Sequence, residues 1–551
     1  MMENKDLEAE IHPLRNEARK SQENLENQVE KEETFRKSTP PQSRLSRCRT
    51  VAFFLSLFVC LLVIFIISFI IPCPERPVSQ RMWRVDYNTA VALNFLAMED
   101  VNRDRIQDVL FLYKNINSSD SSNRSCASEG FSTPCTIAAA VSGASGSLLW
   151  ERAVAQDVAL VECSVPQLEG SGASPTCVLV DVSGAFTALD PLTGDTLWSR
   201  PSRPGTNVSV LGPVLRVPDG DGDGTPDLLV LTREEEEVGV HLYSGSSGLQ
   251  IGRRGSLGCK GTGGPLLHVT RTGAHYLLVP CASALCGRSV KRLYEEVTGR
   301  PNLLKTDPVW ERRVNTSAPR MPLHSSGTIR FLMSVPGKTG EDVLLVGSEA
   351  CVLLDRQELT PTWAFGATQV LRKPTLGHFT PDAGAVAIEN GTGIDRQIWL
   401  LDLGTGAALW SQPLPGLPGG PPSTSLLTAD HRSAFFFWGL HDGENQTEAR
   451  GARHRLYMFH PTLPHVLLEL TNVSANVVAF DMVLFEHSRH AACILLTGPV
   501  GPEVPGLVSL TKQKVKDLIL GSRVLRLGTG GSDSDQAVRD RFSRLRYLSG
   551  A

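Results

Sequence analysis

Two segments, Leu189-Asp-Pro-Leu-Thr-Gly-Asp-Thr-Leu-Trp198 and Leu401-Asp-Leu-Gly-Thr-Gly-Ala-Ala-Leu-Trp410, share one pattern that decides the fold. Each runs from an apolar residue and Asp through Thr-Gly to Leu-Trp. Glycine accepts the positive φ of a tight turn, and Asp can accept hydrogen bonds from neighbouring amides. Each segment is therefore predicted to be a β-hairpin whose Trp begins the return strand. Residues 141–150 are a close third copy, residues 354–363 are a looser one, and residues 243–252 keep only the Ser-Gly turn.

The hairpins recur at intervals of roughly 50 residues, as expected for a repeat architecture. Residues 293–299 fill one double gap, and residues 459–468 and 509–518 extend the series to eight units. Two further apolar runs precede the hairpins, as residues 158–163 and 177–182 do in the second unit. Units of four short strands are typical of a β-propeller. We therefore predict an all-β propeller of about eight four-stranded blades, with seven as the alternative, and assign the tryptophans to the core between blades.

Two nine-residue loops carry metal-binding chemistry, because both fit D-x-[DN]-x-D-x-x-x-D and both lead into an apolar strand. Oxygen ligands at positions one, three, five and nine, with a backbone carbonyl at position seven, can surround a hard cation such as Ca²⁺. An EF-hand is excluded, since position twelve would need Glu where the loops have Phe111 and Val230. The predicted ligands are Asp100, Asn102, Asp104 and Asp108 in the first loop and Asp219, Asp221, Asp223 and Asp227 in the second.

The two loops differ in how well they suit a cation. Four carboxylates within residues 219–227 would repel one another without a counter-charge, so a structural Ca²⁺ is predicted there. In the first loop Arg105 stands where Gly224 permits a tight turn, and Arg103 adds a second positive charge. An empty structural loop stays open as the alternative for the first segment, and a solvated acidic turn for the second.

A membrane segment precedes the repeats. Residues 51–71 form an uncharged run of 21 residues, which is long enough as a helix to cross the roughly 30 Å hydrocarbon layer. A cleaved signal peptide would lie closer to the N-terminus, so an uncleaved signal anchor is predicted. Lys and Arg are more frequent in the 15 residues before the run than in the 15 after it, which favours a cytoplasmic N-terminus.

Glycosylation acceptors and cysteines support the same orientation, since all seven Asn-x-Ser/Thr sites and ten of the 12 cysteines follow the span. We therefore predict a single-pass type II membrane glycoprotein of the cell surface or secretory pathway. The acceptors are Asn117, Asn123, Asn207, Asn315, Asn390, Asn445 and Asn472. The predicted disulfides join Cys126 with Cys135, Cys163 with Cys177 and Cys281 with Cys286, because each pair joins neighbouring strands or closes a short loop. Other connectivities stay open.

The remaining segments complete the predicted domain organisation. Residues 1–50 hold ten acidic and ten basic side chains and are expected to be a disordered cytoplasmic tail, with Ser21 and Thr39 as phosphorylation candidates or simply solvated residues. The signal anchor spans 51–71, a linker 72–84 and the propeller 85–528. Residues 529–551 are predicted to hold a short amphipathic helix docked on the propeller rim.

At the two acidic loops the sequence resembles the FG-GAP repeats of integrin α propellers, whose calcium loops have this nine-residue form between two blade strands. The whole layout is similar to the integrin-alpha FG-GAP repeat-containing type II membrane proteins of the family with sequence similarity 234. The similarity covers nearly the full chain and implies a lumenal or extracellular propeller on a type II anchor. It implies no activity, and integrin ligand-binding features are not carried over, because the match is limited to the metal loops and the propeller strands.

Composition and missing motifs favour an interaction protein over an enzyme. The formal net charge is −4 and the calculated pI is about 6.4, so no nucleic-acid partner is indicated. The chain lacks the Gly-x-Ser-x-Gly elbow of a serine hydrolase. Leu332 stands in place of the first glycine of a P-loop ending at Thr339. We therefore predict a Ca²⁺-stabilised propeller that binds a protein or glycan partner; the alternative is an enzyme or accessory subunit with a site in the central channel.

Overall fold

A computed structural model describes residues 44–70 and, with gaps, residues 79–548. The gaps are 116–125, 164–175, 202–208, 235–236, 261–263, 282, 316–323, 326, 338–339, 367–368, 381–382, 393–394, 417–419, 441–453, 486–489, 500–503 and 529–532. The chain forms two units, Met1–Glu75 and Arg76–Ala551. The predicted phosphorylation sites Ser21 and Thr39 lie outside the described residues.

The first unit contains one described helix, α1 (Arg44–Ile70). Within it, Arg49–Ser68 is long and apolar enough to cross a membrane, and none of this stretch is buried. It overlaps the predicted span 51–71, so the helix is compatible with a single-pass membrane protein.

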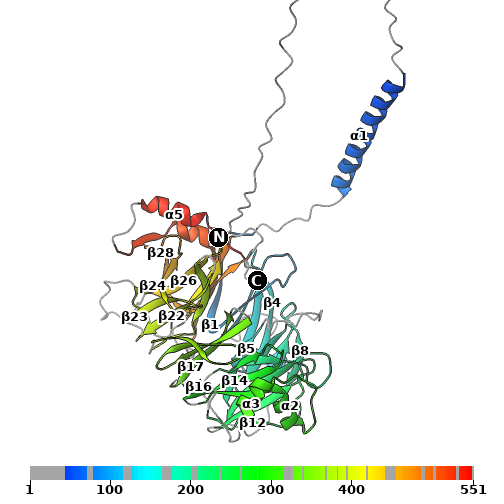
Figure 1. Cartoon of the computed structure of the whole chain (residues 1–551). Helices are drawn as coiled ribbons and strands as arrows, with labels where there is room; N and C mark the ends of the chain where they lie inside the picture. The colour runs from blue at the N-terminus through cyan, green and yellow to red at the C-terminus, as the bar shows by residue number, and fades with distance from the viewer. Residues whose placement is uncertain are drawn as a thin grey trace, which may run out of the picture. The chain divides into compact units, whose positions relative to one another are not determined.

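The second unit consists largely of antiparallel strands (Figure 1). By their hydrogen-bonded order these strands group into eight blades. Six blades are separate sheets, and the other two share β1 within one seven-stranded sheet. First strands of neighbouring blades, such as β5 and β9, contact one another and form the inner edge. Second strands such as β10 carry a buried apolar run, here residues 228–231, because a blade is covered on both faces by its neighbours. The predicted propeller is confirmed, and the described strands favour eight blades over seven.

The first four blades are formed by β1 (Met82–Glu99), β2 (Asp108–Asn115), β3 (Thr136–Val141), β4 (Leu148–Ala155), β5 (Val158–Glu162), β6 (Cys177–Asp181), β7 (Phe186–Leu189), β8 (Thr196–Arg200), β9 (Ser209–Val217), β10 (Asp227–Glu234), β11 (Glu237–Tyr243), β12 (Gly255–Ser256), β13 (Leu266–Val269), β14 (His275–Cys281), β15 (Ala284–Ser289) and β16 (His324–Ser325). The next three blades are formed by β17 (Ile329–Gly337), β18 (Gly340–Gly347), β19 (Cys351–Leu354), β20 (Pro361–Phe365), β21 (Thr375–Thr380), β22 (Ala383–Gly391), β23 (Arg396–Asp402), β24 (Ala408–Pro413), β25 (Thr424–Leu427), β26 (Ser433–Gly439), β27 (His454–Phe459) and β28 (Val466–Val473). The eighth blade has β29 (Asn476–Leu484), β30 (Ala491–Gly498), β31 (Gly506–Lys514) and the start of β1, and β32 (Arg523–Arg526) is added to the seventh.

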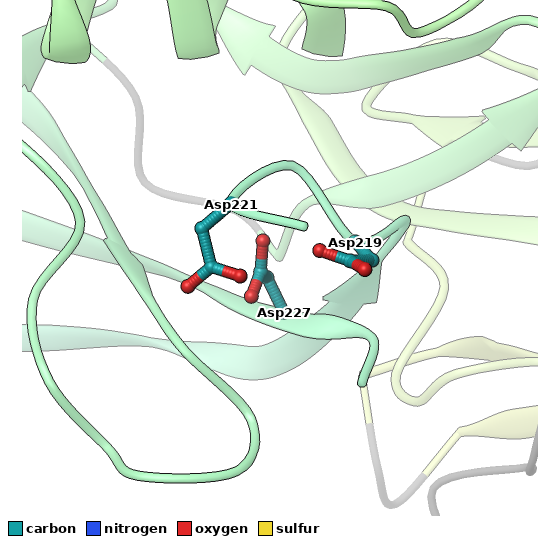
Figure 2. Close-up of side chains that lie close together, drawn as sticks. All are labelled: Asp219, Asp221 and Asp227. Carbon is teal, nitrogen blue, oxygen red and sulfur yellow. The ribbon is translucent and has the colours of Figure 1, made fainter. Parts of the chain in front are cut away.

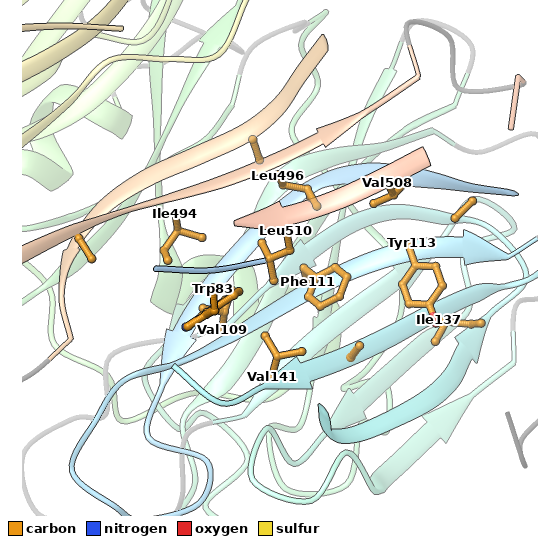
Figure 3. Close-up of a cluster of buried hydrophobic side chains, with 14 of the residues drawn as sticks. Trp83, Val109, Phe111, Tyr113, Ile137, Val141, Ile494, Leu496, Val508 and Leu510 are labelled. Atoms are coloured by element: carbon orange, nitrogen blue, oxygen red, sulfur yellow. The ribbon is translucent and has the colours of Figure 1, made fainter. Parts of the chain in front are cut away.

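Strand β1 closes the ring, because it belongs to the last blade and to the first. Its beginning pairs with β31 from Met82 onward, and its end pairs with β2 up to Glu99. A buried core joins the two ends of the propeller, and Figure 3 shows Trp83, Phe111 and Leu510 within it. The propeller therefore begins at Met82, inside the segment 72–84 that the sequence predicts to be a linker.

Tryptophans connect successive blades through the hairpins that decided the fold. An indole on the outer strand of one blade donates a hydrogen bond to a backbone carbonyl in the hairpin of the next blade. The rings of Trp83, Trp150 and Trp363 also face a glycine of that hairpin. These bonds run from Trp83 to Gly143 O (3.0 Å), Trp150 to Pro191 O (3.0 Å), Trp363 to Leu403 O (2.8 Å) and Trp410 to Pro464 O (3.1 Å). At Gly194 an added Cβ would lie 2.6 Å from Trp150 Cε3, so only glycine lets the ring approach. The structure places these tryptophans between blades, as predicted.

Two of the predicted hairpins are wrong. Residues 293–299 belong to α2 (Val290–Thr298), whose buried residues Val290, Leu293, Tyr294 and Val297 have helical spacing. The Thr-Gly pair there ends a helix, with Gly299 in the left-handed conformation of a C-cap. Residues 509–518 continue from β31 into α4 (Val515–Leu520). The apolar 3.6-residue period in residues 290–297 was the sequence signal that a helix replaces the hairpin in the fourth blade.

The remaining short helices are η1 (Cys126–Glu129), α3 (Pro308–Asn315) and α5 (Asp535–Ser543). In α5, Val538 and Phe542 are buried in the same core as Leu518 of α4. The C-terminal helix therefore packs on the propeller, as predicted.

We expect Gly194→Ala to destabilise the protein more than Gly184→Ala. Both glycines have a left-handed backbone, with φ of +72° and +85°, but only at Gly194 would the new methyl group meet an indole ring. The left-handed conformation costs about 1–2 kcal/mol in each variant, and displacing the ring of Trp150 should add about 1–3 kcal/mol for Gly194→Ala. Urea unfolding of both variants measures the difference, and equal losses would show that the ring contact contributes nothing.

Candidate metal centre

The two acidic loops share one position in the blade and one backbone conformation. The first joins β1 to β2, and the second joins β9 to β10. Positions four and six are left-handed in both: Gly222 and Gly224 have φ of +82° and +86°, and Arg103 and Arg105 have φ of +60° and +67°. This conformation costs little for glycine but about 1–2 kcal/mol for an arginine. The first loop therefore keeps the form of a metal loop with residues that do not favour it.

The carboxylate at position one holds each loop in this conformation. In the second loop Asp219 accepts hydrogen bonds from the amides of Gly222 (2.6 Å) and Gly224 (2.8 Å). In the first loop Asp100 accepts from the amides of Asp104 and Arg105, both at 3.0 Å. The shared aspartate pattern thus shapes the backbone before any cation is considered.

In the second loop three of the four predicted ligands lie together. Asp219, Asp221 and Asp227 each offer an oxygen, and these oxygens lie within 4.8 Å of one another (Figure 2). Two oxygens bound to one Ca²⁺ at about 2.4 Å can be at most about 5 Å apart. The spacing therefore suits one calcium ion.

Asp227 is the carboxylate of this cluster whose charge is least compensated by its surroundings. Its side chain is fully buried, and Oδ2 accepts hydrogen bonds from the Gly220 amide (2.8 Å) and the Tyr294 hydroxyl (2.5 Å). Its Oδ1 is buried without any hydrogen-bond partner among the described residues. A buried acceptor without a partner costs about 1–3 kcal/mol, and more when it is charged.

The pKa of Asp227 also indicates that its negative charge is not compensated. Burial raises its pKa to about 6, and the carboxylates of Asp221 and Asp219 act in the same direction against the hydrogen bonds from Tyr294 and Gly220. A divalent cation would remove this repulsion. The second loop thus has the donor set, the spacing and the uncompensated charge of a cation site.

Asp223, the fourth predicted ligand, points elsewhere. Its Oδ2 accepts hydrogen bonds from the Ser244 hydroxyl (2.8 Å) and the Ser246 hydroxyl (2.5 Å), and the bond from Ser246 lowers the pKa of Asp223. Both serines belong to the turn that follows β11. In this structure Asp223 therefore ties the acidic loop to the hairpin of its own blade.

In the first loop the buried carboxylate is satisfied by backbone amides, two from the loop itself and one from the neighbouring hairpin. Asp108, which corresponds to Asp227, is also fully buried, but Oδ2 accepts from the amides of Val101 (2.9 Å) and Asn102 (3.2 Å) and Oδ1 accepts from the amide of Gly143 (2.9 Å). The side-chain Nδ2 of Asn102 donates to Oδ2 of Asp104 at 3.0 Å. These contacts are those expected of an empty structural loop, the alternative for the first segment. The binding of a cation by the first loop stays a prediction.

Comparison with known proteins places this architecture in a family. Residues 83–548 match the family model described as the FAM234A/B beta-propeller. Protein FAM234A of Homo sapiens is 67% identical over 553 residues, covering 100% of both chains. The chain belongs to the FAM234A/B family. Protein FAM234B of Gallus gallus is 28% identical over 528 residues, covering 91% of this chain and 83% of that protein. The crystal structure of Saccharomyces cerevisiae Sqt1 is similar with a TM-score of 0.46 at 11% identity, covering 79% of this chain and 99% of that chain.

The resemblance to this family is confirmed, while the relation of the acidic loops to integrin FG-GAP repeats stays a prediction. The FAM234A/B match runs to residue 548, beyond the predicted end of the propeller at 528. This agrees with the packing of α5 on the seventh and eighth blades.

The predicted glycosylation acceptors have different surroundings in this FAM234A/B chain. Asn472 is exposed on β28. Asn390 lies half-buried on β22, where its side-chain oxygen accepts a hydrogen bond from the Gln369 amide (2.9 Å). Asn315 is the last residue of α3. The other four, Asn117, Asn123, Asn207 and Asn445, lie outside the described residues.

Two of the three predicted disulfides are present in the structure, joining Cys126 to Cys135 and Cys163 to Cys177. Cys281 and Cys286 are not bonded to each other in this structure, and their pairing stays a prediction. On the β14–β15 hairpin Cys286 faces Val279, and Cys281 faces Ala284. The two cysteines are therefore diagonal neighbours and not directly opposite, and this register is not readable from their short separation in sequence.

Tyr294 and Asn302 are the residues of this region that sequence reasoning missed. The Tyr294 hydroxyl donates to Asp227, 67 residues away, and the Asn302 amide donates to the carbonyl of Gly220 at 3.0 Å. Both residues come from the fourth blade and contact the acidic loop of the third. The helical spacing around Tyr294 could have indicated a buried position, but nothing local indicates its partner.

We expect glycosidase digestion to increase the gel mobility of this FAM234A/B protein, because the sequons share one side of α1. Asn472→Gln should remove one glycan, since its side chain is exposed, whereas Asn390→Gln should have a smaller effect, since its side-chain oxygen is already bound. Asn476→Gln, which changes no sequon, is the control for migration. Unchanged mobility together with protease protection of the N-terminus would reverse the orientation.

Proposed function

We propose that this chain is a single-pass type II membrane glycoprotein whose lumenal or extracellular propeller binds Ca²⁺ in the third blade and serves as an interaction module for a partner protein. The membrane-compatible helix α1 and the seven sequons after it support the anchor and its orientation. The interaction role is supported by the surface beside the acidic loop. A glycan partner, or an enzymatic site in the central channel, is the alternative that the experiments below distinguish.

The observation that carries the calcium part is the buried Oδ1 of Asp227, for which the described part of the chain offers no hydrogen-bond partner. The carboxylates of Asp219 and Asp221 lie close to Asp227. Ca²⁺ takes six to eight oxygen ligands and accepts carboxylates in flexible geometry. These three carboxylates would supply part of such a shell, and loop carbonyls and water would complete it. The ion would thereby compensate both the buried acceptor and the mutual repulsion.

A bound ion would also order a neighbouring segment of the fourth blade. Tyr294 on α2 donates to Asp227 and also to the carbonyl of Pro218 (3.1 Å). Asn302, which follows α2, donates to the carbonyl of Gly220. The segment 299–306, which belongs to the connection between α2 and α3, is therefore held on the metal loop by Asn302 within it and by Tyr294 on the helix before it. Loss of the ion should loosen this connection before it affects distant blades.

Residues 299–306 have the features of a partner-binding loop. Leu303 is 103% exposed, although Asn302 beside it is hydrogen-bonded on both its backbone and its side chain. Arg300 and Lys305 are exposed on either side of it. An exposed leucine on an ordered loop suits an apolar pocket, and the two cations suit acidic residues around that pocket. A leucine offers no aromatic face for a sugar, so this surface favours a protein partner over a glycan.

We expect Ca²⁺ to raise the melting temperature of the protein and Asp227→Asn to abolish that rise. One site stabilises by about 2.7 kcal/mol when free Ca²⁺ is 100-fold above its Kd. Asp108→Asn is the matched control, because this buried carboxylate accepts three backbone amides. It should lower stability by about 1–3 kcal/mol but leave the calcium-dependent rise intact. Identical melting curves of the unsubstituted protein with and without Ca²⁺ would refute the site.

We expect Leu303→Ser to weaken capture of surface partners without lowering the melting temperature, because the exposed side chain contributes no packing. Leu197→Ser on β8 is the matched control, since that leucine is 55% exposed on another blade. Proximity labelling in cells, quantified for both variants, gives the readout. Equal labelling by both variants would exclude the loop as the partner surface. Turnover of a substrate that depends on channel-facing residues would instead favour the enzymatic alternative.

A further inference from the structure

Three cysteines from two neighbouring blades meet around one thiol. Cys281 ends β14 and Cys286 lies on β15, both in the fourth blade, while Cys259 follows β12 of the third blade. The Cys281 thiol is in hydrogen-bond contact with the thiols of both Cys259 and Cys286. Cys259 and Cys281 are buried, Cys286 is partly exposed, and none of the three is in a disulfide in this structure.

Backbone pairing positions the three sulfurs from both blades. Because Cys281 faces Ala284 and Val279 faces Cys286 in the hairpin register, Cys281 and Cys286 project from the same face of the sheet as diagonal neighbours. The carbonyl of Cys259 accepts a hydrogen bond from the Val238 amide (3.3 Å), which ties its segment to β11. Cys281 is thus the central member, with one neighbour in its own blade and another across the blade interface.

This interface differs from those that tryptophans connect. The outer segment of the third blade, residues 249–256, has no tryptophan, and α2 takes the place of the hairpin in the fourth blade. Contacts across it are made by other groups: Gly252 packs against the carbonyl of Val297, and the Arg253 amide donates to that carbonyl at 2.9 Å. A covalent link between Cys259 and Cys281 would therefore join the two blades where the repeated contact is replaced.

We propose that Cys281 is the shared sulfur of an exchangeable disulfide, bonded to Cys259 in one form and to Cys286 in the other. The first form links the blade with the metal loop to the blade with α2 and α3, and the second lies within the fourth blade. The proposal rests on the lumenal or extracellular orientation proposed above, since disulfides persist in oxidising compartments. Cys286 is the member that solvent thiols and disulfides can reach, because its side chain is partly exposed.

The chemistry balances without a metal or a bound cofactor. Two of the thiols are first oxidised by a disulfide of a thiol–disulfide oxidoreductase or of oxidised glutathione, which is reduced to two thiols as the protein disulfide forms. In the exchange step the Cys286 thiolate attacks Sγ of Cys281, the bond from Cys281 to Cys259 breaks, and Cys259 leaves as a thiolate that takes up a proton. The exchange transfers no net electrons, so it can run in either direction once the first disulfide exists.

Disulfide mapping of the full-length protein tests this proposal. Membranes are treated with N-ethylmaleimide before any reductant, and the cross-linked peptides are identified by mass spectrometry. We expect two cross-links, from Cys281 to Cys259 and from Cys281 to Cys286, and one alkylated thiol per chain among the three. Cys286→Ser should lose the second cross-link completely, and Cys259→Ser should lose the first. The cross-links found in the unsubstituted protein test the proposal even if a variant fails to fold.

The disulfides Cys126–Cys135 and Cys163–Cys177 are internal controls for the compartment. Alkylation of all three clustered thiols while both control disulfides stay intact would overturn the exchange and leave the proposed orientation standing. A single cross-link in the unsubstituted protein, unchanged after incubation with reduced glutathione, would also overturn it. Alkylation of the control cysteines as well would overturn both the exchange and the lumenal orientation.

Discussion

The packing of an outer-strand indole on the hairpin glycine of the next blade is the contact on which the ring depends. It combines apolar burial with a directional hydrogen bond, so it fixes the angle between blades as well as their distance. Trp83 makes the same contact across the closure, from the last blade to the hairpin of the first. Because β1 is shared between these two blades, closure adds strand pairing to the repeated contact.

A rigid ring allows the loops at the ends of its strands to diverge. The two acidic loops have the same backbone conformation at equivalent places, yet they meet the needs of their buried aspartates differently. Asp108 is surrounded by backbone amides, one of which comes from Gly143 in the hairpin that binds Trp83. Among the described residues, Asp227 has two donors, both to Oδ2, and its Oδ1 has no hydrogen-bond partner. The first loop is thus part of the blade framework, whereas the second is suited to a cation.

The interface between the third and fourth blades holds both the proposed calcium site and the cysteine cluster. Where a helix replaces the hairpin, the blades meet through Tyr294 and Asp227, through Asn302 and Gly220, and through the thiols of Cys259 and Cys281. These contacts join polar or reactive groups, whereas an indole packs on a glycine at other interfaces. The exposed loop 299–306 lies next to these contacts. Loss of a contact at this interface would therefore loosen first the surface that we propose to bind a partner.

The sequence by itself determined the features that depend on neighbours along the chain. Apolar period, turn glycines and length were enough for the strands, the Trp-bearing hairpins, the apolar helix and the two acidic loops, because backbone conformation there is set within about ten residues. Tertiary structure decided the rest. The Thr-Gly pair at residues 298–299 ends a helix, and Asp223 accepts hydrogen bonds from serines in the hairpin of its own blade. Cys281 has a second thiol neighbour, and Met82 pairs with the last blade. Each of these outcomes depends on contacts between residues distant in sequence, and such contacts are set by how blades pack and not by any local pattern.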